Sequence, residues 1–158
     1  MAWKKDDLIP ESEIKDRVTD VTVEFAKRFG SYLGKDDRRS EIDRNGKQKQ
    51  IKELKLTTSQ LRKFFGEVKK QQMNGYDETE FVLLKPKLAY AVGRAAVGRA
   101  KDSYSKINDF YHVISRAMDC VKADTKEETK KRFHNFIKVF EAIVAYHKAA
   151  EESKLNDN

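Results

Sequence analysis

The sequence contains a single cysteine, Cys120, which excludes an intrachain disulfide and is typical of a reducing compartment. Its two prolines and seven glycines are too few to punctuate an all-β fold of many short strands. It has no apolar run long enough to span a membrane, and residues 1–7 lack the apolar core of a signal peptide. We therefore expect one helical domain over residues 1–158, in the cytoplasm and without a membrane partner.

Patterns for catalysis and metal binding are also lacking. The three histidines, His112, His134 and His147, have no second ligand at a spacing typical of metal sites. His147 extends an apolar helical stripe and is interpreted as a histidine at the edge of the core. Cys120 has no CxxC partner and is interpreted as a small buried hydrophobic residue. Because no residues supply a nucleophile, a base and an oxyanion donor together, we expect no enzymatic activity, cofactor or metal.

The residues that are abundant favour helices. Charged residues make up 37% of the chain and hydrophobic residues 39%, a balance typical of helices with narrow apolar stripes. Apolar residues recur three and four positions apart, and residues 57–60 and 125–128 have the pattern of capping boxes. The prediction is an all-α fold, a compact bundle of about five helices. They cover residues 11–34, 57–75, 77–92 with a kink or split at Pro86, 102–122, and 125 to about 151.

Two segments lack apolar residues. Residues 35–50 contain almost none besides Ile42, and they are predicted to form a flexible basic loop that burial cannot order. The polar residues after 151 are predicted to fray.

Positive charge is concentrated in the middle of the chain. The formal net charge is +7, and residues 56–101 hold nine Lys or Arg against four acids. A localised positive field attracts a polyanion, because each neutralised phosphate releases condensed counterions. Nucleic acid is therefore the first partner to consider.

Three runs carry a resemblance to a known family. They are residues 56–68 (LTTSQLRKFFGEV), 81–94 (FVLLKPKLAYAVGR) and 136–148 (FIKVFEAIVAYHK). In this order and at these separations they resemble the small subunit of type III-A CRISPR effector (Csm) complexes. The resemblance covers roughly residues 56–148, while residues 1–55 carry little of it.

The resemblance implies a small all-α protein without an active site of its own. Several copies would stack along the guide RNA–target RNA duplex, beside the backbone and large subunits of the complex. The expected partners are therefore crRNA, target RNA, other Csm subunits and copies of the chain itself. Base pairing would read the sequence, so that the protein recognises phosphates and shape.

The basic residues of the middle segment are the candidate RNA contacts. Spacing by seven residues places Arg62 and Lys69 on nearly the same helix face, and likewise Lys63 and Lys70. Tyr90 either stacks on a ribose or base or packs between helices, and packing is favoured. The predicted RNA-binding residues are Arg62, Lys63, Lys69, Lys70, Lys85, Lys87, Arg94 and Arg99. The alternative for each is an ordinary solubilising charge.

Two other functions stay open. A helical scaffold could use the basic face to bind an acidic protein, and its partners would survive nuclease treatment. A small helical enzyme would need a pocket with converging polar groups, for which the sequence offers no candidate.

Overall fold

The computed structural model describes residues 3–96 and 102–152, and these are mostly helical with a small three-stranded sheet. The helices are α1 (Glu11–Lys15), α2 (Asp20–Leu33), α3 (Thr58–Asn74), α4 (Glu78–Val82), α5 (Leu84–Ala96), α6 (Ile107–Asp119) and α7 (Lys126–Glu151). The strands are β1 (Asp37–Ile42), β2 (Gln48–Leu54) and β3 (Ser103–Ser105). The predicted helical bundle is confirmed in outline, whereas the prediction of an all-α fold is wrong.

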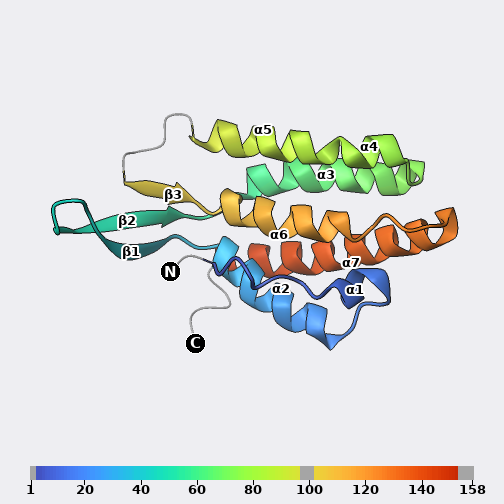
Figure 1. Ribbon diagram of the computed structural model, residues 1–158, viewed down its shortest axis with the longest axis horizontal. Coiled ribbons are helices and arrows are strands. Elements are labelled where there is room, and N and C mark those ends of the chain that lie inside the picture. The colour runs from blue at the N-terminus through green and yellow to red at the C-terminus, as the bar shows by residue number, and fades with distance from the viewer. Residues whose placement is uncertain (1–2, 97–101, 153–158) are drawn as a thin grey trace.

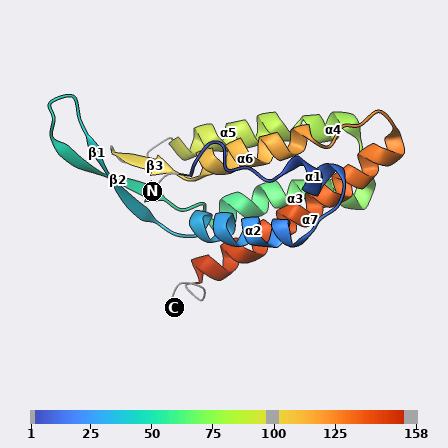
Figure 2. The same ribbon diagram turned by 60° about the horizontal axis from the view of Figure 1, so that its bottom comes forward.

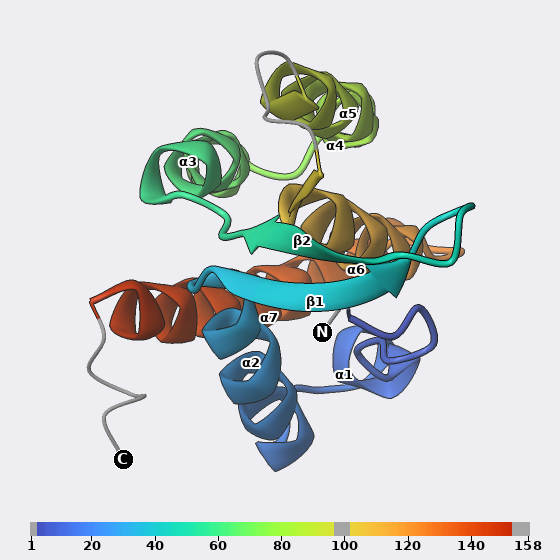
Figure 3. The ribbon, with the colours of Figure 1, turned by 90° about the vertical axis from the view of Figure 1, so that its left-hand side faces the viewer.

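The helices form layers around α6 and α7 (Figures 1 and 3). The long helix α7 packs against α1, α2 and α3, while α5 packs against α3 and α6. The helices α2 and α5 therefore lie on opposite sides of the bundle. The strands β1 and β2 extend beyond the helices at one end, close to where α3 begins and α5 ends (Figures 1 and 2).

Aromatic rings from three helices fill the centre of the bundle. Phe110 on α6 and Phe140 on α7 are almost fully buried. The ring of Phe64 on α3 lies 5.9 Å from the ring of Phe110 and 5.6 Å from that of Phe140. Such pairs contribute roughly 0.5–1.5 kcal/mol each beyond the area they bury. The periodic apolar positions of the sequence therefore do form one shared core.

The first predicted helix is in fact two, because a buried carboxylate caps the second. Glu13 in α1 accepts hydrogen bonds from the backbone and hydroxyl of Thr19, both at 2.8 Å. It accepts two more from Thr22, at 3.0 and 2.7 Å. Burial acts to raise the pKa of Glu13, but these four hydrogen bonds outweigh it and lower the pKa. They satisfy backbone amides at the start of α2 and fix the break between the helices.

The next helices begin and divide as the sequence predicts. Thr57 and Gln60 form a capping box, with the Gln60 amide donating to Thr57 Oγ1 at 3.1 Å and the Thr57 amide to Gln60 Oε1 at 2.9 Å. Asp77 caps α4 through the amide of Glu80 at 2.9 Å. Pro86 has no amide to donate to the carbonyl of Val82, where α4 ends, and α5 starts two residues later.

Residues 35–50 hold most of a β-hairpin where the sequence analysis predicts a loop. Strands β1 and β2 pair antiparallel from Asp37 opposite Glu53 to Ile42 opposite Gln48. Strand β3 then pairs parallel with the end of β2, at residues that the sequence analysis assigns to the fourth helix. The loop prediction and the early start of that helix are therefore wrong.

The hairpin turn is built from polar residues and glycine, so the pattern of apolar residues does not predict it. Asp43 Oδ1 accepts from the amides of Asn45 and Lys47, both at 2.9 Å, and Gly46 has a φ of 77°. Asn-Gly is a strong hairpin signal that the apolar periodicity does not contain. Only Ile51 of the hairpin's apolar residues is buried, because the hairpin extends past the helices.

A buried lysine ties the sheet to the bundle. Lys106, between β3 and α6, has no exposed surface, and its Nζ donates to the carbonyls of Tyr32 at 2.7 Å and Lys35 at 2.6 Å. It also donates to Asp37 Oδ2 at 2.6 Å and lies 4.0 Å from the centre of the Tyr32 ring. One ammonium group thus joins the end of α2, the start of β1 and the start of α6.

Glycine allows α2 and α7 to approach closely. A Cβ at Gly30 would lie 2.8 Å from the carbonyl oxygen of Ile143 and 2.9 Å from the amide nitrogen of His147. His147 is buried, and its Nε2 lies 2.5 Å from the carbonyl oxygen of Leu56. This burial agrees with the interpretation of His147 as a histidine at the edge of the core.

We predict that Gly30→Ala destabilises the protein by about 1–3 kcal/mol, because the added methyl meets helix backbone that cannot move aside alone. Gly66→Ala is the matched control, since a Cβ there meets nothing within 4 Å. It should stabilise the protein by about 0.5–1 kcal/mol through its helix propensity. Urea unfolding measures both. Equal effects of the two changes would contradict the close helix contact.

Lys106→Met should cost about 2–4 kcal/mol of unfolding free energy, because it leaves two partly buried carbonyls and the Asp37 carboxylate without their donor. The exposed Lys131→Met should change stability by less than about 0.5 kcal/mol. Chemical denaturation of the two variants makes the comparison. A Lys106 variant as stable as the control would show that the ammonium does not hold the junction.

Candidate nucleic-acid interface

A groove of about 540 Å³ runs between α3 and α5. Buried Phe64 belongs to its apolar part, together with the half-buried Ala91 and Ala95. Six polar residues line the groove, and they include three cations and one acid. The six are Gln60, Lys63 and Glu67 from α3, and Lys87, Tyr90 and Arg94 from α5.

The cations of the groove differ in their partners. Lys87 Nζ lies 3.1 Å from Glu67 Oε2, and both side chains are about half exposed, at 50% and 42%. Lys63 and Arg94 are exposed, and within the described part of the chain neither has an ion pair. An exposed ion pair contributes at most about 1 kcal/mol, so that an anion in the groove can compete with Glu67 for Lys87.

Tyr90 faces solvent beside these cations. Its exposed fraction is 70%, so the favoured prediction that it packs between helices is wrong. An exposed aromatic ring beside cationic side chains is suited to stacking on a base, which tolerates any sequence.

The other predicted RNA-binding residues that the structure describes lie outside the groove. Lys69 points toward α7, where its Nζ is 3.3 Å from Glu141 Oε1 and 5.8 Å from the centre of the Phe65 ring. Lys85 forms an ion pair with Asp119 at the end of α6. Both lysines thus form ion pairs with acids of other helices.

Two further candidates have no ion pair among the residues that the structure describes. Arg62 and Lys70 are exposed on α3 but do not line the groove. Arg99 lies outside the described residues. Of the eight predicted residues, the structure gathers Lys63, Lys87 and Arg94 in one place.

Sequence reasoning missed Gln60 and Glu67 as groove residues. Glu67 follows Lys63 by four positions, which places both side chains on one face of a helix. The same spacing joins Lys87, Tyr90 and Arg94, at offsets of three and four residues. Applied to both helices, this periodicity would have separated the groove from the α7 side of α3.

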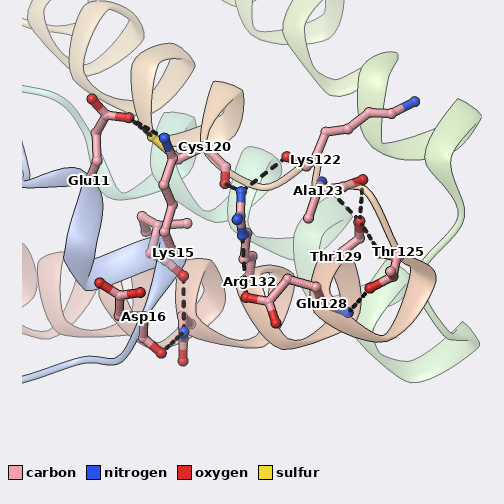
Figure 4. A network of polar contacts seen from close by, with 12 residues as sticks. Glu11, Lys15, Asp16, Cys120, Lys122, Ala123, Thr125, Glu128, Thr129 and Arg132 are labelled. Carbon is pink, nitrogen blue, oxygen red and sulfur yellow. Dashed lines mark hydrogen bonds and ion pairs between the residues drawn. The ribbon is translucent and has the colours of Figure 1, made fainter.

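A polar network lies around Cys120 at the end of the bundle opposite the hairpin, where α6 ends and α7 begins (Figure 4). Arg132 donates to the carbonyls of Cys120 at 3.4 Å and Lys122 at 3.2 Å. Burial and the nearby Glu11 carboxylate raise the pKa of the Cys120 thiol, which disfavours the reactive thiolate. Cys120 is 8% exposed, and its prediction as a small buried residue is confirmed.

Two further kinds of feature are absent from the described residues. No three His, Cys, Asp or Glu side chains within residues 3–96 and 102–152 gather in a way that would hold a metal ion. None of the helices formed by those residues is both long and apolar enough to cross a membrane.

The fold and the groove define a small, mostly helical protein with a cationic groove between two neighbouring helices. The family model for Csm2 Type III-A matches residues 36–153. The chain therefore belongs to this family, the small subunit of type III-A CRISPR Csm complexes. Membership implies a place in the effector complex among the other Csm subunits. No curated protein and no solved structure matches the chain.

Proposed function

We propose that the chain is a non-catalytic RNA-binding subunit whose α3–α5 groove holds the phosphate backbone of target RNA along the guide–target duplex. The observation that carries the proposal is the convergence of Lys63, Lys87 and Arg94 on one groove with a single acid. Cationic side chains of this kind bind phosphates without reading bases. Pairing with the guide RNA would supply the sequence specificity.

The proposal includes stacking of several copies in the complex, and exposed apolar side chains support it. Val82 and Leu83, where α4 meets α5, are 57% and 44% exposed. Val21 and Val23 on α2 are 48% and 46% exposed. The helices α5 and α2 lie on opposite sides of the bundle (Figure 3). Exposed apolar side chains on opposite sides of the bundle suit head-to-tail contacts, which extend into a filament.

Removing the two unpaired cations of the groove should weaken RNA binding. We expect Lys63→Gln with Arg94→Gln to raise the Kd for labelled single-stranded RNA roughly five- to tenfold. The slope of log K against log salt should fall by about 1.4, because each phosphate contact on a single strand contributes about 0.7. Fluorescence anisotropy across a salt series measures both quantities.

The control for this pair removes the same charge from helices outside the groove. Lys27 on α2 and Lys131 on α7 are both exposed. Lys27→Gln with Lys131→Gln should leave the Kd within roughly twofold. If the Lys63→Gln, Arg94→Gln variant had the same Kd for RNA as this control variant, the groove would not be the RNA site. If the unaltered protein bound no RNA and its protein partners stayed bound after nuclease treatment, the scaffold function would be favoured.

Neutralising the acid of the groove should act in the opposite direction. Glu67→Gln frees Lys87 and removes repulsion of phosphate, so that RNA affinity should rise roughly two- to fivefold. Glu141→Gln is the matched control, because it frees Lys69 on the α7 side of α3. Anisotropy titrations of both variants make the comparison. A larger gain from Glu141→Gln would place the RNA on the other side of α3.

A further inference from the structure

The two faces of the hairpin differ sharply in charge. The residues of β1 and β2 that stand opposite each other share a face. One face is exposed at every position and will be called the outer face. It consists of Arg38, Ser40, Ile42, Gln48, Gln50 and Lys52. It therefore carries two cations, three uncharged polar side chains and no acid.

The opposite, inner face has its charges paired. Arg39 lies 3.1 Å from Glu41 and 3.6 Å from Glu53, which is fully buried. Lys49 Nζ lies 3.1 Å from Asp102 Oδ1, and Ile51 is buried. The ion pairs of the inner face thus attach the hairpin to itself and to the residues before β3.

On the outer face two cations stand directly opposite each other. Arg38 pairs in register with Lys52, and neither has an ion-pair partner among the residues that the structure describes. Cross-strand neighbours lie about 5 Å apart at Cβ, and like charges there are destabilising. An anion bound between Arg38 and Lys52 would remove this repulsion.

Two acids that line a hollow together with this pair already accept hydrogen bonds from other donors. A shallow hollow at the base of the hairpin is lined by Arg38, Lys52 and two carboxylates, those of Asp36 and Asp37. Asp36 Oδ1 accepts from the amide of Lys55 at 2.8 Å. Asp37 Oδ2 accepts from the buried Lys106. The carboxylates are therefore held by other donors and not by the cations of the outer face.

We propose that the outer face of the hairpin is a second RNA-binding surface, which holds phosphates between Arg38 and Lys52. The proposal rests on the RNA-binding function proposed above and adds a site to it. Arg, Lys, Gln and Ser are the side chains that contact phosphate and sugar in nucleic-acid complexes. The face has no aromatic residue and one exposed apolar residue, Ile42, whereas protein interfaces have apolar and aromatic centres.

The place of the hairpin in the fold suits a continuous path for RNA. Strand β2 ends at Leu54 and α3 begins at Thr58, so that the hairpin leads directly into a wall of the groove. The hairpin extends beyond the helices at the end where α3 starts and α5 stops (Figure 1). Lys63 near the start of α3 and Arg94 near the end of α5 are thus the groove cations closest along the chain to that end.

The test compares three double variants of the full chain. Arg38→Gln with Lys52→Gln removes the outer-face cations, Lys63→Gln with Arg94→Gln removes the groove cations, and Lys27→Gln with Lys131→Gln is the charge-matched control. The probe is fluorescein-labelled single-stranded RNA long enough to span both surfaces. Loss of the outer-face pair removes a like-charge repulsion, so that thermal stability should stay the same or rise slightly. Unfolding therefore cannot mimic the expected effect.

We expect the outer-face variant to raise the Kd roughly three- to tenfold and to lower the salt slope by about 1.4, while the control stays within roughly twofold. An outer-face variant that behaves like the control overturns the inference. A variant that keeps RNA affinity but no longer enters the effector complex also overturns it, in favour of a protein partner. If only the groove variant loses affinity, the hairpin site fails and the proposed function stands. If neither variant loses affinity, both fail.

Discussion

The buried ammonium of Lys106 is the interaction on which the junction of helices and sheet depends. It has no exposed surface and satisfies the carbonyls of Tyr32 and Lys35 together with the Asp37 carboxylate. A buried charge is costly unless every donor finds a partner, so these three acceptors fix where the chain leaves α2 and enters β1. Nearby Asp109 accepts from the hydroxyls of Tyr32 and Tyr104 at 2.7 and 2.8 Å, which adds further polar contacts to this corner. The hairpin is thereby anchored at its base while its outer face stays open to solvent.

Charge pairing separates the basic residues that already face an acid from those that face solvent alone. Many lysines of the chain face an acid of another element, as Lys69 faces Glu141 and Lys49 faces Asp102. Of the described cations without such a partner, Lys63 and Arg94 lie at the α3–α5 groove and Arg38 and Lys52 on the outer face of the hairpin. Others, such as Lys27, Arg62 and Lys131, are exposed elsewhere on the helices. Net charge therefore overstates the binding surface, and the distribution of unpaired cations is the more useful guide.

The sequence predicts the features that depend on residues close together in the chain, and it misses those that depend on more distant contacts. The capping box of Thr57 and Gln60 and the break near Pro86 are local, and the sequence predicts both. The division between α1 and α2 depends on Glu13 reaching Thr19 and Thr22, a side-chain contact that apolar periodicity does not contain. The hairpin lacks apolar alternation because most of it faces water, so its only local signal was the Asn-Gly turn.

The candidate site shows the same limit. Lys63, Lys87 and Arg94 were predicted by charge and by resemblance to the Csm small subunit. The sequence could not place Lys69 and Lys85 outside the groove, because their partners Glu141 and Asp119 are 72 and 34 residues away in the chain. Helical spacing within α3 and α5 could have identified Glu67 and Tyr90 as neighbours of those cations, but the pairing of α3 with α5 is a tertiary contact.

The most direct test of the account is photo-crosslinking of target RNA in the assembled effector complex, with the attachment sites on this chain mapped by mass spectrometry. The account predicts crosslinks in peptides of α3 and α5, and in particular at the exposed ring of Tyr90. Crosslinks confined to α2 and α7, with none in α3 or α5, would contradict it.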